Sequence, residues 1–101
     1  MCTSIVEIVR AEGAGKSSDG WFGISHAVVS YDHPSHALLD DGIIIDFINR
    51  DMGPDKRAAV ELTLDSAKAL KGALERAIAA AEAEEAEVAE AQASRLRATA
   101  A

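Results

Sequence analysis

The sequence has one cysteine, Cys2, so no disulfide can close within the chain. Basic residues are also scarce, since ten Lys and Arg stand against 17 Asp and Glu and the net charge is −7. Such a charge repels phosphate backbones and anionic lipids, which excludes nucleic acid and membrane surfaces as expected partners. No apolar run approaches the roughly 20 residues that span a bilayer, and the first residues lack a secretory signal pattern. We therefore expect a cytoplasmic protein.

The length and composition predict one domain followed by an acidic tail. A chain of 101 residues with 49% apolar side chains can build one modest core but not two. Five acidic residues cluster late in the chain, at Glu82, Glu84, Glu85, Glu87 and Glu90. We expect a single α+β domain over residues 1–81, which includes the first half of a helix, and a partly frayed Ala/Glu-rich helical tail over residues 82–101.

Four segments have the composition of β-strands. Residues 2–10, 21–31 and 42–49 are rich in β-branched and aromatic side chains, residues 57–64 alternate between apolar and outward-pointing positions, and turn-forming residues separate most of these segments. The turn formers of residues 11–20 predict a flexible, solvated loop. Because links this short do not allow a parallel return, the strands are expected to run antiparallel.

The last strand is expected to lead into a helix. Within residues 57–64 the apolar side chains point inward and the alternate positions point outward: Arg57, Ala59, Glu61 and Thr63. Asp65 is expected to cap the helix, and apolar residues then recur along one helical stripe to Ala81, with helical propensity to about Arg97. The expected fold class is α+β: a four-stranded antiparallel sheet with a long C-terminal helix packed on one face. Because the middle strands are apolar on both faces and one helix covers one face, we also expect a homodimer.

Two tempting motifs are rejected. Gly15-Lys16-Ser17 resembles the end of a phosphate-binding P-loop, but Arg10 stands where that motif needs a glycine, and a strand follows instead of a helix. Cys2 could act as a nucleophile, yet a small residue at the start of a strand is the simpler interpretation.

The three histidines, His26, His33 and His36, fall within eleven residues. His33 and His36 lie on the link between two predicted strands, and loops held by a rigid sheet often carry sites. With Asp32 they could bind a divalent metal such as zinc, iron, manganese or copper. They could equally serve as acid and base. The alternative is structural: His33 caps the turn and His36 is solvated.

Asp46 interrupts an otherwise apolar strand and therefore needs a partner, for which the candidates are His26, Arg10 and Arg57. A His–Asp pair would orient an acid–base imidazole, whereas an arginine partner would be structural. Trp21 and Tyr31 have the same strand parity. They belong to the core or form the aromatic wall of a ligand pocket that also includes His26.

The chain resembles a small bacterial protein family of unknown function over residues 1–80. The matching segments are Met1-Cys2-Thr3, Gly20-Trp21-Phe22, residues 31–37 around Asp32-His33-Pro34-Ser35-His36, residues 45–49 and Gly53-Pro54 followed by residues 59–62. His26 is not part of this pattern, and the tail extends beyond it. The resemblance implies one compact unit and supplies no activity.

Two functions are therefore expected as alternatives. In the first, a dimeric protein holds a small molecule or divalent metal, with His33, His36 and Asp46 as the reactive groups. In the second, a non-catalytic dimerisation module uses its acidic C-terminal helix to bind a basic partner.

Overall fold

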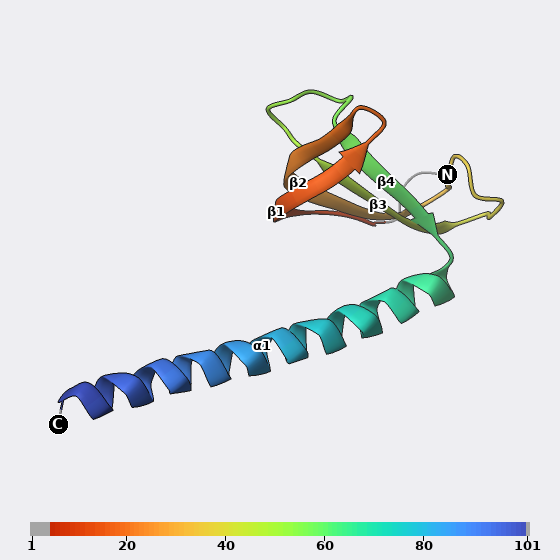
Figure 1. Cartoon of the computed structure of the whole chain (residues 1–101). Coiled ribbons are helices and arrows are strands. Elements are labelled where there is room, and N and C mark those ends of the chain that lie inside the picture. Colours follow the sequence, from red (N-terminus) through yellow and green to blue (C-terminus); the bar gives the residue numbers. More distant parts are fainter. Residues whose placement is uncertain (1–4, 101) are drawn as a thin grey trace. The chain divides into compact units, whose positions relative to one another are not determined.

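A computed structural model describes residues 5–100 of the chain. Four strands, β1 (Ile5–Ser17), β2 (Gly20–Asp32), β3 (Gly42–Ile48) and β4 (Arg57–Leu62), precede one helix, α1 (Leu64–Ala100). The strands form one antiparallel sheet in the order β1-β2-β3-β4 (Figure 1). The predicted α+β fold class, with a four-stranded antiparallel sheet and one long C-terminal helix, is confirmed. Cys2 and the first residues of the predicted strand lie outside the described residues.

The prediction of a flexible loop over residues 11–20 is wrong, because β1 continues through most of it. β1 runs to Ser17, and β2 starts at Gly20 after a two-residue turn. Gly20 has a φ of 118°, which a side chain would disfavour, and the Ser17 hydroxyl donates to its carbonyl at 3.2 Å. A register shift between Arg10 and Gly13 places one extra residue in β1, so the ladder bends instead of ending.

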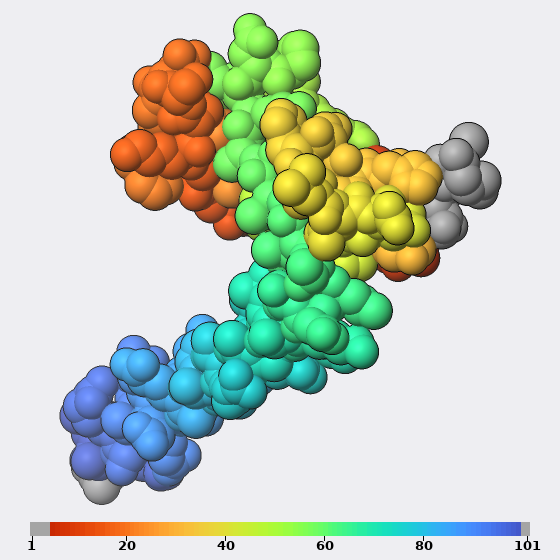
Figure 2. Space-filling view, turned by 90° about the vertical axis from the view of Figure 1, so that its right-hand side faces the viewer, coloured from red at the N-terminus to blue at the C-terminus, as the bar shows by residue number. Residues whose placement is uncertain are grey.

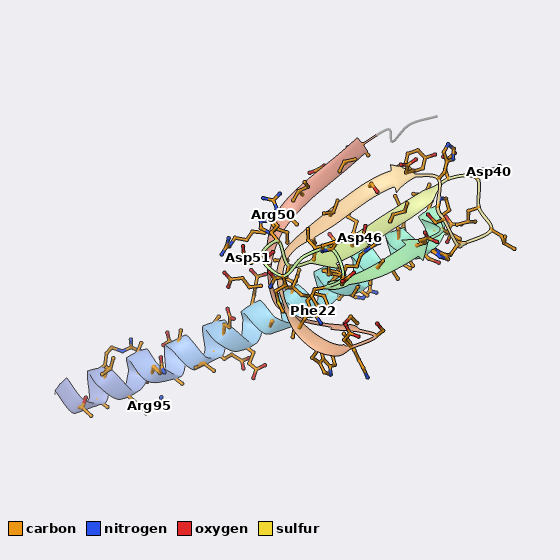
Figure 3. All side chains as sticks on the ribbon, turned by 90° about the horizontal axis from the view of Figure 1, so that it is seen from above. Phe22, Asp40, Asp46, Arg50, Asp51 and Arg95 are labelled. Carbon is orange, nitrogen blue, oxygen red and sulfur yellow. The ribbon has the colours of Figure 1, made fainter. Side chains whose placement is uncertain are left out.

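The hairpin end of β1 and β2 curls toward β4. β1 contacts β4 although two strands separate them in the sheet, and Lys56 pairs with Asp19 of the hairpin turn at 3.4 Å (Figure 1). Phe22 is 4% exposed and Ala27 is 6% exposed, and they are the buried hydrophobic side chains among the described residues. Figure 3 places Phe22 and Asp40 at opposite ends of the sheet.

The register sorts the side chains into two faces, because directly paired residues point to the same side. One face, which we call the groove face after the groove described below, carries the following residues of β3 and β4: Ile44, Asp46, Ile48, Arg57, Ala59 and Glu61. The opposite face carries the apolar residues Ile5, Val9, Ala27, Val29, Tyr31, Ile43, Ile45, Phe47, Val60 and Leu62.

Most of the helix belongs to a second compact unit of the chain. The chain divides into residues Met1–Ala67, which include the sheet, and Lys68–Ala101. Thr63 caps the helix in place of the predicted Asp65, since its hydroxyl accepts the N–H of Ser66 at 3.1 Å. Within residues 5–100 no helix has a stretch apolar enough to span a bilayer. Packing of α1 on a sheet face, and a domain boundary near residue 81, stay predictions.

Candidate functional site

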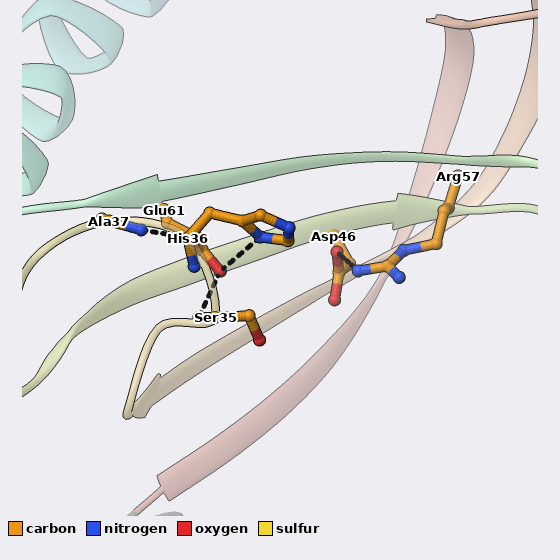
Figure 4. A network of polar contacts seen from close by, with 6 residues as sticks. All are labelled: Ser35, His36, Ala37, Asp46, Arg57 and Glu61. Carbon is orange, nitrogen blue, oxygen red and sulfur yellow. Dashed lines mark hydrogen bonds and ion pairs between the residues drawn. The ribbon is translucent and has the colours of Figure 1, made fainter.

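One carboxylate holds the link between β2 and β3, residues 33–41, in place. We call this segment the anchored link. Glu61 on β4 accepts backbone N–H groups from Ser35 at 2.8 Å, from His36 at 2.8 Å and from Ala37 at 2.9 Å (Figure 4). The Ala37 N–H, with those of Ser35 and His36 and the nearby His36 ring, lowers the pKa of Glu61, although partial desolvation opposes the shift. Figure 2 shows this link, in yellow, lying against the green surface of β4.

His36 is presented to solvent by this anchored link. Its side chain is 91% exposed, and its Nδ1 lies 3.7 Å from Oε2 of Glu61. The ring projects from the link toward the Asp46–Arg57 pair (Figure 4). The backbone is therefore fixed by three hydrogen bonds while Nε2 remains available to a ligand.

Asp46 is paired with Arg57, one of its three predicted candidates. Nη2 of Arg57 lies 2.7 Å from Oδ1 of Asp46, across the β3–β4 ladder. The register explains this choice, since Ile48 is opposite Arg57 and Asp46 lies one diagonal step away on the same face. His26 instead directs Nδ1 to the hydroxyl of Ser25 at 2.8 Å. The structure therefore does not form the His26–Asp46 pair.

An open groove of about 670 Å³ joins these features. Its lining residues come from the link, β3 and β4: Ser35, His36, Ala37, Ile44, Arg57, Ala59, Val60 and Glu61. Ile44 and Ala59 supply an apolar floor, while the imidazole and the guanidinium stand at the polar rim. This groove is an arrangement that can hold a small molecule by one polar and one apolar part.

The two linked histidines do not share this groove. Nδ1 of His33 lies 2.6 Å from the backbone oxygen of Asp40 and 3.2 Å from Oδ1 of Asp41. Since both neighbours are acceptors, Nδ1 carries a hydrogen and closes the turn. The backbone N–H of His33 donates to Asp32 at 2.7 Å. His33 therefore has the turn-capping contacts of the structural alternative, and His36 is the solvated ring that faces the groove.

A metal-binding set is not gathered in the described residues. Within residues 5–100, no three His, Cys, Asp or Glu side chains come together in a way that could hold a metal ion. His33, His36 and Asp32 as metal ligands therefore stay a prediction, which elemental analysis of untagged protein would test.

The aromatic residues Trp21 and Tyr31 do not line the groove. Trp21 is 71% exposed on the hairpin opposite Lys16. Tyr31 borders a separate hollow of about 310 Å³ with Ile5, Glu7, Val9, Val29, Ser30 and Ile43. The reason is parity: Tyr31 pairs directly with Ile43, whereas the groove is built on the other face.

Glu61 is the site residue that sequence reasoning missed. Strand alternation placed it among outward-facing residues, yet its side chain is 16% exposed because the link covers it. A glutamate between apolar residues near a strand end is a weak signal for such an anchor. Only the fold, which brings together residues 24 to 26 positions apart, reveals its three amide partners.

Comparison with known proteins identifies a family without an assigned activity. No curated protein and no solved structure matches the chain. The sequence profile of a family of unknown function, DUF6295, matches residues 1–87, which extends past the resemblance over residues 1–80. The chain therefore belongs to DUF6295.

Proposed function

We propose that the groove binds a small carboxylic acid, with Arg57 and His36 as its hydrogen-bond donors. The observation that carries this proposal is the position of an exposed imidazole, on a link fixed by Glu61, beside a guanidinium above an apolar floor. Arg57 uses one nitrogen on Asp46, and its side chain is about half exposed. Its remaining N–H groups are free to pair with a ligand carboxylate.

His36 supplies the acid–base chemistry of the proposed site. The Glu61 carboxylate near Nδ1 favours a hydrogen on that nitrogen, so Nε2 of the neutral ring is an acceptor. The imidazolium form donates from both ring nitrogens, and it is this form in which His36 is a donor to a ligand carboxylate. Asp46 orients Arg57 and takes no proton in this scheme. The single cysteine supports a cytoplasmic location for this activity.

Amide chemical shifts of the ¹⁵N-labelled full chain test the proposal directly. Carboxylates from acetate to hexanoate are titrated, with the matching alcohols as neutral controls. We expect the acids, but not the alcohols, to shift the amides of Ser35, His36 and Ala37. Longer acids are expected to bind more tightly because they cover Ile44 and Ala59.

Matched variants assign the binding to the groove. Arg57→Met and His36→Ala are each expected to weaken carboxylate binding, Arg57→Met by about tenfold or more, because a charge-assisted hydrogen bond is lost. His33→Ala serves as the control, since His33 lies outside the groove lining. The proposal is wrong if no carboxylate shifts these amides, or if His33→Ala weakens binding as much as His36→Ala. Under the alternative function, a module acting through its acidic helix, His36→Ala leaves all binding intact.

A further inference from the structure

The outer edge of β1 has the side-chain pattern of a strand inside a sheet. Its first half, Ile5–Arg10, which we call the β1 edge, carries Ile5 and Val9 on one face and Val6 and Ile8 on the other. These four side chains are between 49% and 54% exposed. Among residues 5–100, no strand pairs with this side of β1. Strands that are apolar on both faces are usually flanked on both sides.

The other exposed edge of the sheet is built differently. On the groove face β4 carries Arg57 and Glu61, and the anchored link lies against it (Figure 2). The second half of β1 is interrupted by the register shift after Arg10, and it contains Glu12 and Lys16. Charges, bulges and covering loops are the features by which sheet edges avoid pairing. The β1 edge also carries two charges, Glu7 and Arg10, but it contains no proline, and the register shift begins only after it.

We infer that the β1 edge pairs antiparallel with the β1 edge of a second copy of this chain. An unpaired strand edge presents backbone N–H and C=O groups, and these specify another strand as the partner. A two-fold axis perpendicular to the sheet, near Ile8, lets the edge N–H and C=O groups of each copy pair with those of the other. With this axis, each face of the sheet continues into the same face of the second copy.

Charge favours a second copy at this position despite the acidity of the chain. The net charge is −7, yet the β1 edge is neutral because it contains one glutamate, Glu7, and one arginine, Arg10. The acidic cluster of residues 82–90 belongs to the other compact unit. Pairing near Ile8 places Glu7 opposite Val9 of the copy, so no like charges face each other directly.

The pairing also continues the apolar surface of the opposite face. The hollow that includes Ile5, Val9, Val29, Tyr31 and Ile43 lies beside the β1 edge. In the pair, the corresponding hollows of the two copies become neighbours across the new strand junction. The groove lies on β3 and β4, two strands away, so it stays open in the dimer.

Sedimentation equilibrium of the full chain and two lysine variants tests this assignment. The wild type is expected to form a dimer at micromolar concentration. Ile8→Lys is expected to raise the dimer dissociation constant by about tenfold or more, because a charge would be buried in the strand junction. Val60→Lys, at an exposed apolar position on β4, is the matched control and is expected to leave the constant unchanged. Circular dichroism verifies that each variant folds.

Three results would overturn the inference. These are a monomer throughout the accessible concentration range, a dimer that Val60→Lys disrupts and Ile8→Lys does not, and assemblies larger than a dimer. In the wild-type dimer, hydrogen exchange provides a second measurement, since outward amides of Ile5–Arg10 are expected to gain protection as concentration rises. Carboxylate binding at the groove is measured at the amides of Ser35, His36 and Ala37, which are not in the β1 edge. The binding proposal and the dimer inference can therefore be refuted independently.

Discussion

Truncation of Phe22 tests whether the curled hairpin is part of the folded core. Its side chain is 4% exposed and faces Gly15, where an added Cβ would lie 3.4 Å from the Phe22 ring. Phe→Ala changes in packed cores lower the free energy of unfolding by about 3–5 kcal/mol. Small domains are stable by roughly 5–15 kcal/mol in total, and the presence of two buried hydrophobic side chains within residues 5–100 indicates the lower end. Phe22→Ala is therefore expected to lose most of its stability.

Urea denaturation followed by far-UV circular dichroism measures this loss, with Trp21→Ala as the matched control. Trp21 is the neighbouring aromatic residue, but it is 71% exposed and points to the other side of β2. Its truncation is expected to change the free energy of unfolding by about 0.5 kcal/mol or less. Equal small losses in the two variants would refute the packing of the hairpin end. Equal large losses would instead place Trp21 in a core or interface.

Three further predictions concern the link, the turn and the ion pair. The fold lowers the pKa of Glu61 below its ordinary value of 4.5. The ionised Glu61 therefore contributes its full stabilisation to the free energy of unfolding above pH 4.5, and this stabilisation is lost as the pH falls through the lowered pKa. The stability gap between wild type and Glu61→Gln, from urea titrations, should shrink below pH 4.5, and a constant gap would contradict this. Gly20→Ala should lower the free energy of unfolding by about 1–2 kcal/mol, because the positive φ of Gly20 disfavours a side chain. Gly13→Ala should leave the free energy of unfolding unchanged, because Gly13 has no positive φ and an added Cβ would meet open space. Asp46→Asn should lower the free energy of unfolding by about 0.5–1 kcal/mol, because it removes the partly exposed ion pair with Arg57. The loss should be smaller at about 1 M salt, which screens the pair.

The sheet and helix were predictable because their signals are local. A run of β-branched and aromatic residues marked β3, period-two alternation marked β4, and three- and four-residue spacing marked α1. The hairpin was not predictable in the same way, since its residues have turn-forming composition. There the pairing of Lys16 with Trp21 and of Gly15 with Phe22 decides the structure, and burial of Phe22 stabilises it. Tertiary context overrode local propensity at that position.

The helix start shows the same limit on a smaller scale. Asp65 and Thr63 are both acceptable caps, and they lie two positions apart in the sequence. β4 ends at Leu62, so Thr63 is the first residue free to leave the extended conformation. Its carbonyl accepts the N–H of Ala67 at 2.9 Å, which closes the first helical turn there. Asp65 then lies in the first turn, where its negative charge interacts favourably with the positive end of the helix dipole.

The candidate site was predictable as a location but not as an arrangement. Spacing alone placed His33 and His36 on one link, where two rings could face one ion. The contacts explain why they separate: Asp40 and Asp41 hold the ring of His33, while the amides from Ser35 to Ala37 turn toward Glu61. The Glu61 carboxylate accepts hydrogen bonds from three backbone N–H groups, which fixes the backbone conformation of the link and thereby the direction of the His36 ring. The direction of the His36 ring therefore depends on Glu61, a strand residue that is not itself a donor in the proposed binding.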